Sequence, residues 1–463
     1  MSNISNKRSH EIPRGTFRRY LNPRYLKSPV ITGAFLLTAA GIITKFIGFF
    51  YRIFLSRVFD EESLGIFGLI SPVMMLVHAV CAAGIQNAIT RFVAASKKDK
   101  ASEAYSYLFT GIVISLFLSG SMAYVIFHQA PFIAIRIIGE RRCIPLLRIS
   151  ALSFPLATIH SCITGFFYGR KKAAIPAWSM IIEQSCRVLT VYILFRLSVE
   201  TGLNVSLSYI CVGLLAGEFS SALFSCFMLA IKPDHTGFSM RKSLSIRKGI
   251  SILSLALPIS LNRVCISFIS TIETIQLPKM LVTSGLTTSE ALSVYGVFSG
   301  MASPLIMFPS AFTGSAASLL LPSVSEAQAQ GNTKRIQKTI YLTIGLCFLL
   351  GVGCFLFFFT FADFLGKALF DSNIAASQIR ALSFVCPFLY MSGTLSSILH
   401  GLGKTGITFV FNLSSILFRL GFVFLAVPLI GFSGYIYGTL ISQILYDFLI
   451  ILALRRYLLY DKN

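Results

Sequence analysis

The stretch Thr343-Ile-Gly-Leu-Cys-Phe-Leu-Leu-Gly-Val-Gly-Cys-Phe-Leu-Phe-Phe-Phe-Thr-Phe-Ala-Asp363 decides the fold class of this chain. It is almost entirely apolar, and about 20 apolar residues are needed for a helix to cross the hydrocarbon core of a bilayer. In lipid the backbone polar groups must be satisfied within the segment itself, which selects a helix. Similar runs recur along almost the whole chain. The sequence therefore predicts an all-α integral membrane protein.

The composition supports this class and excludes others. Of the 463 residues, 55% are hydrophobic and 13% are charged, whereas soluble domains carry about 25% charged residues. The net charge of +22 could indicate nucleic-acid binding. However, the basic residues lie in short connecting loops, which is how membrane proteins set their orientation, so we expect no nucleic-acid partner. The ten cysteines stand singly, without C-x-x-C spacing, and predict neither a metal site nor a disulfide framework.

About twelve spans are expected in two lobes. We place them approximately at 31–55, 64–90, 104–127, 143–167, 174–197, 206–231, 250–280, 291–321, 338–361, 379–402, 406–429 and 434–455. The termini and alternate connections hold about 26 Lys and Arg, against about five on the other side. Both termini are therefore expected in the cytoplasm, with the protein in a bacterial plasma membrane. The predicted domains are a basic tail at 1–30, an N-lobe at 31–231, an interlobe loop at 232–249 and a C-lobe at 250–458.

Two features bear on this topology. The connection 128–142 should be external yet contains three arginines, and we expect a short interfacial helix from Pro131 to Ile138 to accommodate them. The six-plus-six parity allows a parallel repeat of the two halves. Weak sequence support comes from Leu64-Gly-Ile-Phe-Gly68 in the second span and Leu292-Ser-Val-Tyr-Gly296 in the eighth.

Charged residues within the spans are the first candidates for function. Inserting a charged side chain at the bilayer centre costs about 2.5–3.5 kcal/mol on insertion scales. Such a residue is therefore expected to have an oppositely charged partner, to line a water-filled cavity or to bind a ligand. Lys45 and Arg52 are seven residues apart and share one helix face. They predict a cationic face for an anionic substrate. The alternative for Arg52 is that it extends to the outer interface.

Other spans carry similar candidates. Arg263 and Glu273 lie in span seven, where Arg263 could bind phosphate and Glu273 could couple an ion, or both could form salt bridges between the lobes. Glu183 and Arg187, spaced i, i+4, predict a structural ion pair.

Further polar residues in the spans have weaker interpretations. Gln86 and Asn87 could hydrogen-bond a sugar or cap a helix, and His160 is expected to be a packing or interfacial residue. Glu218, Arg419 and Asp447 could pair across helices. No catalytic constellation, metal-ligand spacing or nucleotide-binding loop is present in the sequence, so we expect neither an enzyme nor a cofactor.

Four segments resemble the stage V sporulation protein B group of polysaccharide exporters, in the multidrug/oligosaccharidyl-lipid/polysaccharide (MOP) flippase superfamily. They are Thr44–Arg52 with Leu64–Gly68; Ile272–Lys279; Tyr295–Ala302 continuing to Leu321–Glu326; and Leu399–Lys404. The resemblance implies a MATE-like fold whose two six-helix lobes surround a central cavity. It also implies a lipid-linked oligosaccharide as cargo. The related lipid II flippases carry arginines at the positions matching Lys45 and Tyr51. Here the second cation is Arg52, which lies about 100° further round the helix.

The combined interpretation is a flippase that moves a polyprenyl-diphosphate glycan from the inner to the outer leaflet, such as a peptidoglycan precursor for cell wall or spore cortex. Moving about two negative charges out of a negative cytoplasm would release roughly 4–5 kcal/mol per 100 mV, so membrane potential, H⁺ or Na⁺ could drive transport. We expect a monomer that works with cell-wall synthesis enzymes. The alternatives are a drug/cation antiporter on the same fold and a membrane glycosyltransferase or glycan polymerase.

Overall fold

The computed structural model describes residues 29–96, 101–231 and 245–460. The predicted basic tail, apart from its last two residues, and all but the last five residues of the interlobe loop therefore lie outside the described residues. The first six spans are built from α3 (Pro29–Val58), α4 (Glu61–His78), the π-helical turn η1 (Ala79–Ala83), α5 (Gly84–Ala95), α6 (Ala101–Phe132), the π-helical turn η2 (Ile133–Ile138), α7 (Cys143–Ala151), α8 (Ser153–Gly169), α9 (Ala174–Thr201) and α10 (Ser208–Ile231).

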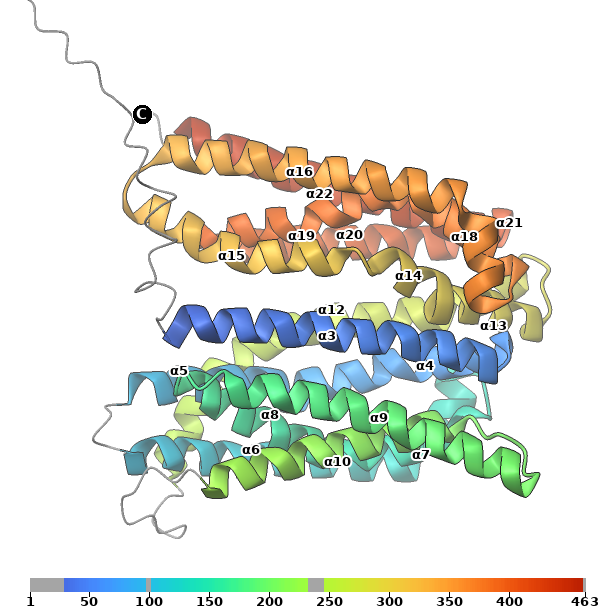
Figure 1. The fold of residues 1–463 in the computed structure, drawn as a ribbon, viewed down its shortest axis with the longest axis horizontal. Coiled ribbons are helices and arrows are strands. Elements are labelled where there is room, and N and C mark those ends of the chain that lie inside the picture. The colour runs from blue at the N-terminus through green and yellow to red at the C-terminus, as the bar shows by residue number, and fades with distance from the viewer. Residues whose placement is uncertain (1–28, 97–100, 232–244, 461–463) are drawn as a thin grey trace, which may run out of the picture.

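The second half repeats the all-helical pattern. It contains α12 (Ile246–Thr283), α13 (Thr288–Val297), the π-helical turn η3 (Phe298–Ala302), α14 (Ser303–Met307), α15 (Ser310–Ala329), α16 (Thr333–Thr360), α17 (Ala362–Leu365), the π-helical turn η4 (Gly366–Phe370), α18 (Asn373–Leu382), the 3₁₀ turn η5 (Ser383–Val385), α19 (Cys386–Gly401), α20 (Thr405–Leu425), α21 (Val427–Ile430) and α22 (Phe432–Tyr460). The two halves form separate bundles, with α3 running between them (Figure 1).

The number of apolar spans is close to the prediction. Among the described residues, ten helices or continuous helical stretches are long and apolar enough to cross a membrane. An eleventh span is the pair Thr288–Met307 and Ser310–Ala329, bent by 56°. The bend coincides with Pro309. Proline has no backbone N–H to donate to the preceding helical turn, which explains the break in the helix there. The twelfth long helix, α9, packs along α3 and α10 and is less apolar because it carries internal charges such as Glu183 and Arg187.

The predicted interfacial helix from Pro131 to Ile138 is wrong. Helix α6 continues through Pro131 and passes directly into η2, so this segment is the end of the third span. The helix ends at Gly139, whose φ of +90° is accessible to glycine at low cost. Only the short turn around Glu140 and Arg142 then connects the third span to the fourth.

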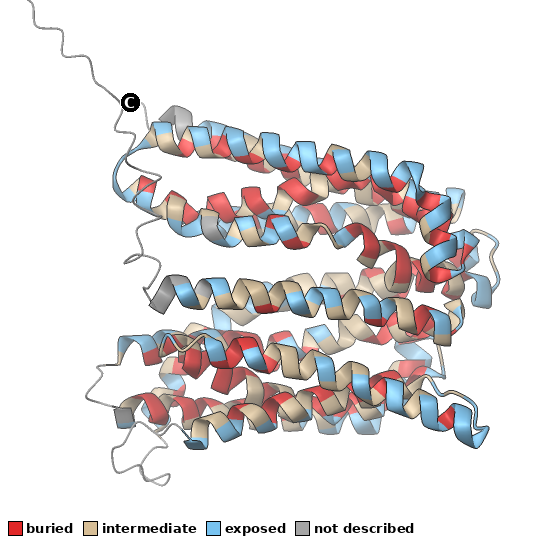
Figure 2. Ribbon diagram, viewed as in Figure 1, coloured by how far each residue is buried: buried red, intermediate tan, exposed pale blue. Residues whose placement is uncertain are grey.

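Each bundle has a buried cluster, and two further clusters contain residues from both lobes, so the hydrophobic core continues across the lobe interface. Figure 2 shows buried residues lining the interior of each bundle. In the N-lobe, Ile85 and Phe167 are buried in one cluster that also contains Ile252 and Ala256 from the first turns of α12. The far end of α12 packs with α13, α20 and α21. The span that opens the C-lobe in sequence therefore begins as part of the N-lobe core.

The lobes meet closely at the end of the molecule opposite the two termini (Figure 1). There α4 crosses α13 through two glycines. A Cβ on Gly65 would lie 2.1 Å from the carbonyl oxygen of Leu292, and a Cβ on Gly296 would lie 2.0 Å from that of Glu61. Because glycine has no side chain, the backbones of α4 and α13 can approach closely at these two positions. These glycines belong to the two similar motifs noted in the sequence, one from each half.

Candidate functional site

The first candidate cation, Lys45, lies on α3 between the lobes. Its side chain is exposed, and Nζ lies 3.9 Å from where a Cβ on Gly314 of α15 would stand. One residue further on, the ring of Phe46 packs edge-on against Phe308, with centroids 4.9 Å apart. Phe49 also contacts Phe308. Lys45 therefore lies where α3 approaches the C-lobe.

Arg52 contacts the opposite lobe directly. Its Nη1 donates a 3.1 Å hydrogen bond to the carbonyl oxygen of Ser299, in the π-helical turn η3. A π-helical turn displaces backbone hydrogen bonds from the regular helical pattern, and such turns often occur at functional sites. Arg52 is thus placed at the lobe interface, and this contact differs from the alternative in which it extends to the outer membrane surface.

Beyond Arg52, polar contacts tie the lobes together toward the end opposite the termini. Arg57 donates from Nε to the carbonyl oxygen of Leu369 at 3.0 Å and from Nη2 to that of Ala368 at 2.6 Å. The hydroxyl groups of Ser372 and Ser289 donate to Glu61 and Glu62 respectively, at 2.5 and 2.6 Å. With the glycine crossing, these contacts close this end of the lobe interface.

A salt-bridge network lies on the same end. Arg142 pairs with Glu62 at 2.5 Å and with Glu140 at 2.9 Å. The hydrogen bonds from Arg142 hold the pKa of the Glu140 carboxyl below its usual value. The arginine that seemed misplaced in an outer loop is therefore neutralised by two carboxylates. Lys279, on α12, adds a 2.7 Å hydrogen bond to the carbonyl oxygen of Ile137.

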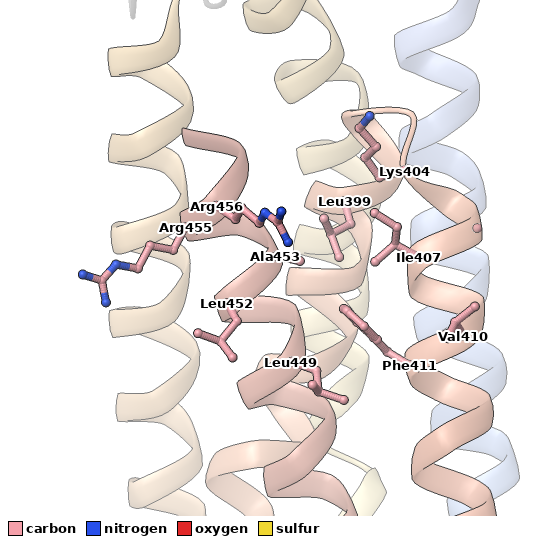
Figure 3. Close-up of a pocket in the computed structure, with 11 residues that line it drawn as sticks. Leu399, Lys404, Ile407, Val410, Phe411, Leu449, Leu452, Ala453, Arg455 and Arg456 are labelled. Carbon is pink, nitrogen blue, oxygen red and sulfur yellow. The ribbon is translucent and has the colours of Figure 1, made fainter. Parts of the chain in front are cut away.

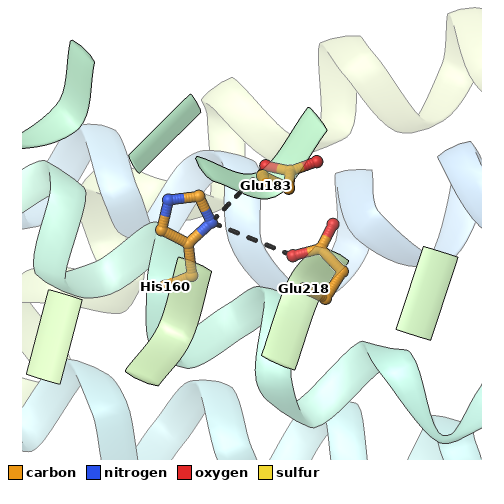
Figure 4. Close-up of side chains that lie close together, drawn as sticks. All are labelled: His160, Glu183 and Glu218. Atoms are coloured by element: carbon orange, nitrogen blue, oxygen red, sulfur yellow. Dashed lines mark ion pairs between the residues drawn. The ribbon is translucent and has the colours of Figure 1, made fainter. Parts of the chain in front are cut away.

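A cluster of ionisable groups lies inside the N-lobe, formed by His160, Glu183 and Glu218 from α8, α9 and α10 (Figure 4). His160 Nδ1 lies 3.8 Å from Glu218 Oε2 and 4.0 Å from Glu183 Oε2. On the opposite side of the ring, Nε2 is 2.8 Å from the hydroxyl of Ser179. The prediction of a packing or interfacial role for His160 therefore missed its two carboxylate partners.

The two carboxylates of this cluster differ in their partners. Arg187 Nη2 lies 2.5 Å from Glu183 Oε1, which is the predicted i, i+4 contact. Glu218 Oε2 is buried and accepts no hydrogen bond in the described part of the chain. Glu218 therefore lacks the close cationic partner that Glu183 has in Arg187. The ligand atoms of His160, Glu183 and Glu218 lie within 4.8 Å of one another, which suits either a shared proton or a cation.

Electrostatic contacts extend this cluster to both sides. His78, on α4, interacts with Glu218, His160 and Arg263. Arg187 interacts with Arg52 on α3. Arg52 is thus within electrostatic range of Arg187, and Arg263 is within electrostatic range of His78. Sequence spacing could not reveal His78 or His160 as members, because each comes from a different helix.

Of the two residues predicted to bind sugar, Gln86 has a hydrogen-bond partner and Asn87 is exposed. Gln86 accepts a 3.0 Å hydrogen bond from the hydroxyl of Ser161 at Oε1. Asn87 is exposed on α5. The first side chain therefore joins α5 to the interior of α8, which is neither the predicted sugar contact nor the predicted helix cap, and Asn87 has an exposed side chain.

Glu273 has a different environment in the C-lobe. Arg419, on α20, donates from Nε and Nη2 to its two carboxylate oxygens at 2.5 and 2.8 Å. Tyr435, on α22, adds a 3.0 Å hydrogen bond. Glu273 is 3% exposed. This arrangement favours a structural ion pair, but one within the C-lobe rather than between the lobes.

Asp447 on α22 is also buried, yet neither of its carboxylate oxygens has a hydrogen-bond partner among the described residues. Burying a carboxylate without a hydrogen-bond partner is energetically costly, so this position is unusual for a structural residue. The expectation that Asp447 would pair across helices is not met there.

Comparison with known proteins identifies the wider class. A family model for polysaccharide biosynthesis proteins matches residues 30–328, and a MatE model matches residues 249–425. Stage V sporulation protein B from Bacillus subtilis is 26% identical over 88% of this chain and 80% of its own length. The lipid II flippase MurJ of the same organism is 22% identical over 92% of this chain and 83% of its own.

Solved structures confirm the fold. An inward-facing multidrug resistance MATE family transporter of the MOP superfamily superposes with a TM-score of 0.74 at 18% identity, over 93% of this chain and 99% of that one. A MOP superfamily transporter from Pyrococcus furiosus gives a TM-score of 0.66 at 17% identity, over 94% and 97% of the two chains. The helical architecture and the length of the family match lead to one conclusion: this multi-span membrane protein belongs to the polysaccharide biosynthesis protein family and has the MOP transporter fold.

Proposed function

We propose that the chain is a flippase that moves the headgroup of a lipid-linked anionic glycan from the cytoplasmic to the outer leaflet of a bacterial plasma membrane. The single observation that carries this proposal is the cationic face of α3, with exposed Lys45 and Arg52, on the helix that runs between the lobes. Similarity to stage V sporulation protein B and to a lipid II flippase supports a lipid-linked cargo.

The physical requirement for such a protein is to replace water around a charged headgroup. Moving an isolated ionised group into hydrocarbon costs tens of kcal/mol on a Born estimate. Lysine and arginine can take over part of the solvation of a diphosphate through charge-assisted hydrogen bonds. In this proposal Lys45, Arg52 and Arg263 make those contacts, Asn87 contacts sugar, and the lipid tail stays in the bilayer.

The contacts between the lobes support a particular stage of transport. The hydrogen bonds of Arg57, Glu61 and Glu62, together with the Gly65–Gly296 crossing, join the lobes opposite the termini. With both termini cytoplasmic, as the distribution of basic residues suggests, this corresponds to a form closed on the outside. Release of the cargo then requires these contacts to break while new ones form near the termini, as alternating access demands.

Ion coupling belongs to the same proposal. Glu273 was one candidate, but both its oxygens are held by Arg419. The His160–Glu183–Glu218 cluster is the stronger candidate, because the spacing of its ligand atoms suits a shared proton or a cation. Arg187 contacts this cluster and also interacts with Arg52, which offers a route by which H⁺ or Na⁺ binding could influence the cargo site.

A drug/cation antiporter is the main alternative, and the MatE match over residues 249–425 favours it. Such a transporter needs acidic groups facing a cationic cargo. The exposed side chains on α3 and α12 named above are instead Lys45, Arg52 and Arg263. The described outer connections at 202–207 and at Gly431 are too short to hold the acidic catalytic loop of a glycosyltransferase.

Reconstitution in vesicles with a fluorescent lipid-linked diphosphate glycan tests the proposal. Replacing Lys45 or Arg263 by alanine should reduce flipping by about 10–100-fold, since a hydrogen bond to a charged group contributes about 1.5–3 kcal/mol. Lys45→Arg is the matched control, because it preserves the charge and should retain most activity.

The same vesicles can separate the alternatives. Cationic dyes should not be transported, and collapsing the membrane potential should slow flipping of the anionic cargo. Dye transport combined with full glycan flipping in Lys45→Ala and Arg263→Ala would contradict the proposal.

A further inference from the structure

A groove on the C-lobe lies away from the candidate cargo site. It has a volume of about 920 Å³ and lies at the terminal end of the molecule, between α19, α20 and α22. Its walls include Leu399, Ile407, Val410, Phe411, Leu449 and Leu452. Figure 3 shows these side chains along the facing surfaces of the helices. The groove is therefore apolar along its length.

Three cations mark the end of the groove at the termini. Lys404 precedes α20, while Arg455 and Arg456 lie in the last turns of α22. Figure 3 shows Arg456 directed toward the groove and Arg455 directed away from it. All three residues are exposed. The positive charge is thus concentrated at one end of an otherwise apolar surface.

Exposed apolar side chains of the groove face outward, away from the interior of the helix bundle. Val410 is 54% exposed and Leu452 is 44% exposed, although both lie on helices apolar enough to cross a membrane. In a bilayer such side chains face acyl chains. Lys404 and Arg456 lie where these helices leave the hydrocarbon, at the depth where lipid phosphates reside.

We propose that this groove is a binding site for an anionic glycerophospholipid of the leaflet on the side of the termini. Lys404 and Arg456 bind the phosphate and the negative headgroup, and Arg455 adds to the local positive potential. One acyl chain lies along the groove. From Lys404 to Val410 the chain advances six residues, or about 9 Å of helix, which covers the upper half of an acyl chain.

The charge pattern distinguishes this occupant from others. A zwitterionic lipid gains little from three nearby cations, because its own cation opposes them. A free acyl chain would use the apolar walls alone. By holding α20 against α22, the bound lipid would stabilise the C-lobe helices that also carry Arg419 and Tyr435.

The test uses full-length protein purified in detergent and exposed to equal amounts of phosphatidylglycerol and phosphatidylcholine, with retained lipid measured by native mass spectrometry. We expect at least fivefold preference for phosphatidylglycerol. The double variant Lys404→Ala/Arg456→Ala should abolish this preference. Lys334→Ala/Lys338→Ala, which removes two exposed cations from α16 at the same end of the molecule, is the matched control and should retain it.

A second variant tests the apolar part independently. Val410→Trp fills the groove without changing charge and should reduce retention of phosphatidylglycerol, while size-exclusion chromatography confirms that each variant is folded. Equal retention of the two lipids by the parent protein overturns the proposal. So does unchanged preference in Lys404→Ala/Arg456→Ala. Retention that rises only after removal of residues 461–463 would show that the chain's own end occupies the groove.

Discussion

Two ion clusters, Glu273–Arg419 in the C-lobe and His160–Glu183–Glu218 in the N-lobe, differ in how completely their charges are paired. In the C-lobe, Glu273 has a bidentate arginine and a tyrosine as partners, so its charge and its hydrogen-bonding capacity are both satisfied. In the N-lobe, Arg187 neutralises Glu183, whereas Glu218 lies near two histidines, His160 and His78, in the described part of the chain. A saturated ion pair favours a single conformation, whereas an incomplete one changes with proton or cation binding. This comparison supports our proposal that the Glu273–Arg419 pair is structural and that the His160–Glu183–Glu218 cluster couples transport to a proton or cation.

The largest expected effect comes from breaking the saturated pair. Replacing Arg419 by alanine leaves the carboxylate of Glu273 buried without its partner, which should cost about 3–5 kcal/mol of unfolding free energy. Thermal unfolding of the purified protein measures this loss. The double variant Glu273→Gln/Arg419→Met removes both charges and should recover much of the stability. If Arg419→Ala is as stable as the parent protein, the Glu273–Arg419 pair does not stabilise the fold.

Arg187 offers the matched experiment in the N-lobe. Glu183 and Arg187 are each about a fifth exposed, so water can partly replace the lost partner. Arg187→Ala should therefore destabilise the protein by about 1–3 kcal/mol, less than Arg419→Ala. Arg187→Lys keeps the charge and serves as the control. If Arg187→Ala proves the more destabilising of the two alanine variants, the contrast between the lobes is reversed.

Glu218→Gln sharpens the contrast further, because it removes the charge that lacks a fixed partner. Its effect on unfolding free energy should stay within about 1 kcal/mol, and flipping should lose its dependence on pH or on the coupling cation. Glu200→Gln, in an exposed i, i+4 pair with Arg196 at the end of α9, is the control and should leave that dependence intact. Wild-type pH dependence in Glu218→Gln would remove the cluster from the coupling proposal.

The smallest effect is expected outside the spans, at Glu140. Its pKa is lowered by the hydrogen bonds from Arg142, so its contribution to stability is present above the unfolded-state pKa and is lost as the pH falls through the lower folded-state pKa. Arg142 is about half exposed, and we expect no more than about 1 kcal/mol. Comparing the thermal stability of the parent and Glu140→Gln should show a difference at neutral pH that disappears in acid.

Much of the fold could be predicted from local sequence. The run Thr343–Asp363 lies largely in α16, and Pro309 coincides with the bend between α14 and α15. The i, i+4 spacing of Glu183 and Arg187 was enough to predict their contact. The end of the third span was missed, because a proline and three arginines suggested a break where the helix continues into η2.

The sequence by itself determined that the chain crosses a membrane many times, since an apolar run has no other stable environment, and it placed cations on one face of α3. The tertiary structure decided which charges meet. Glu273 and Arg419 are 146 residues apart, and His160 on α8 lies near Glu183 on α9 and Glu218 on α10. Such pairings depend on the rotation and crossing of helices distant in sequence, and local periodicity carries no information about either.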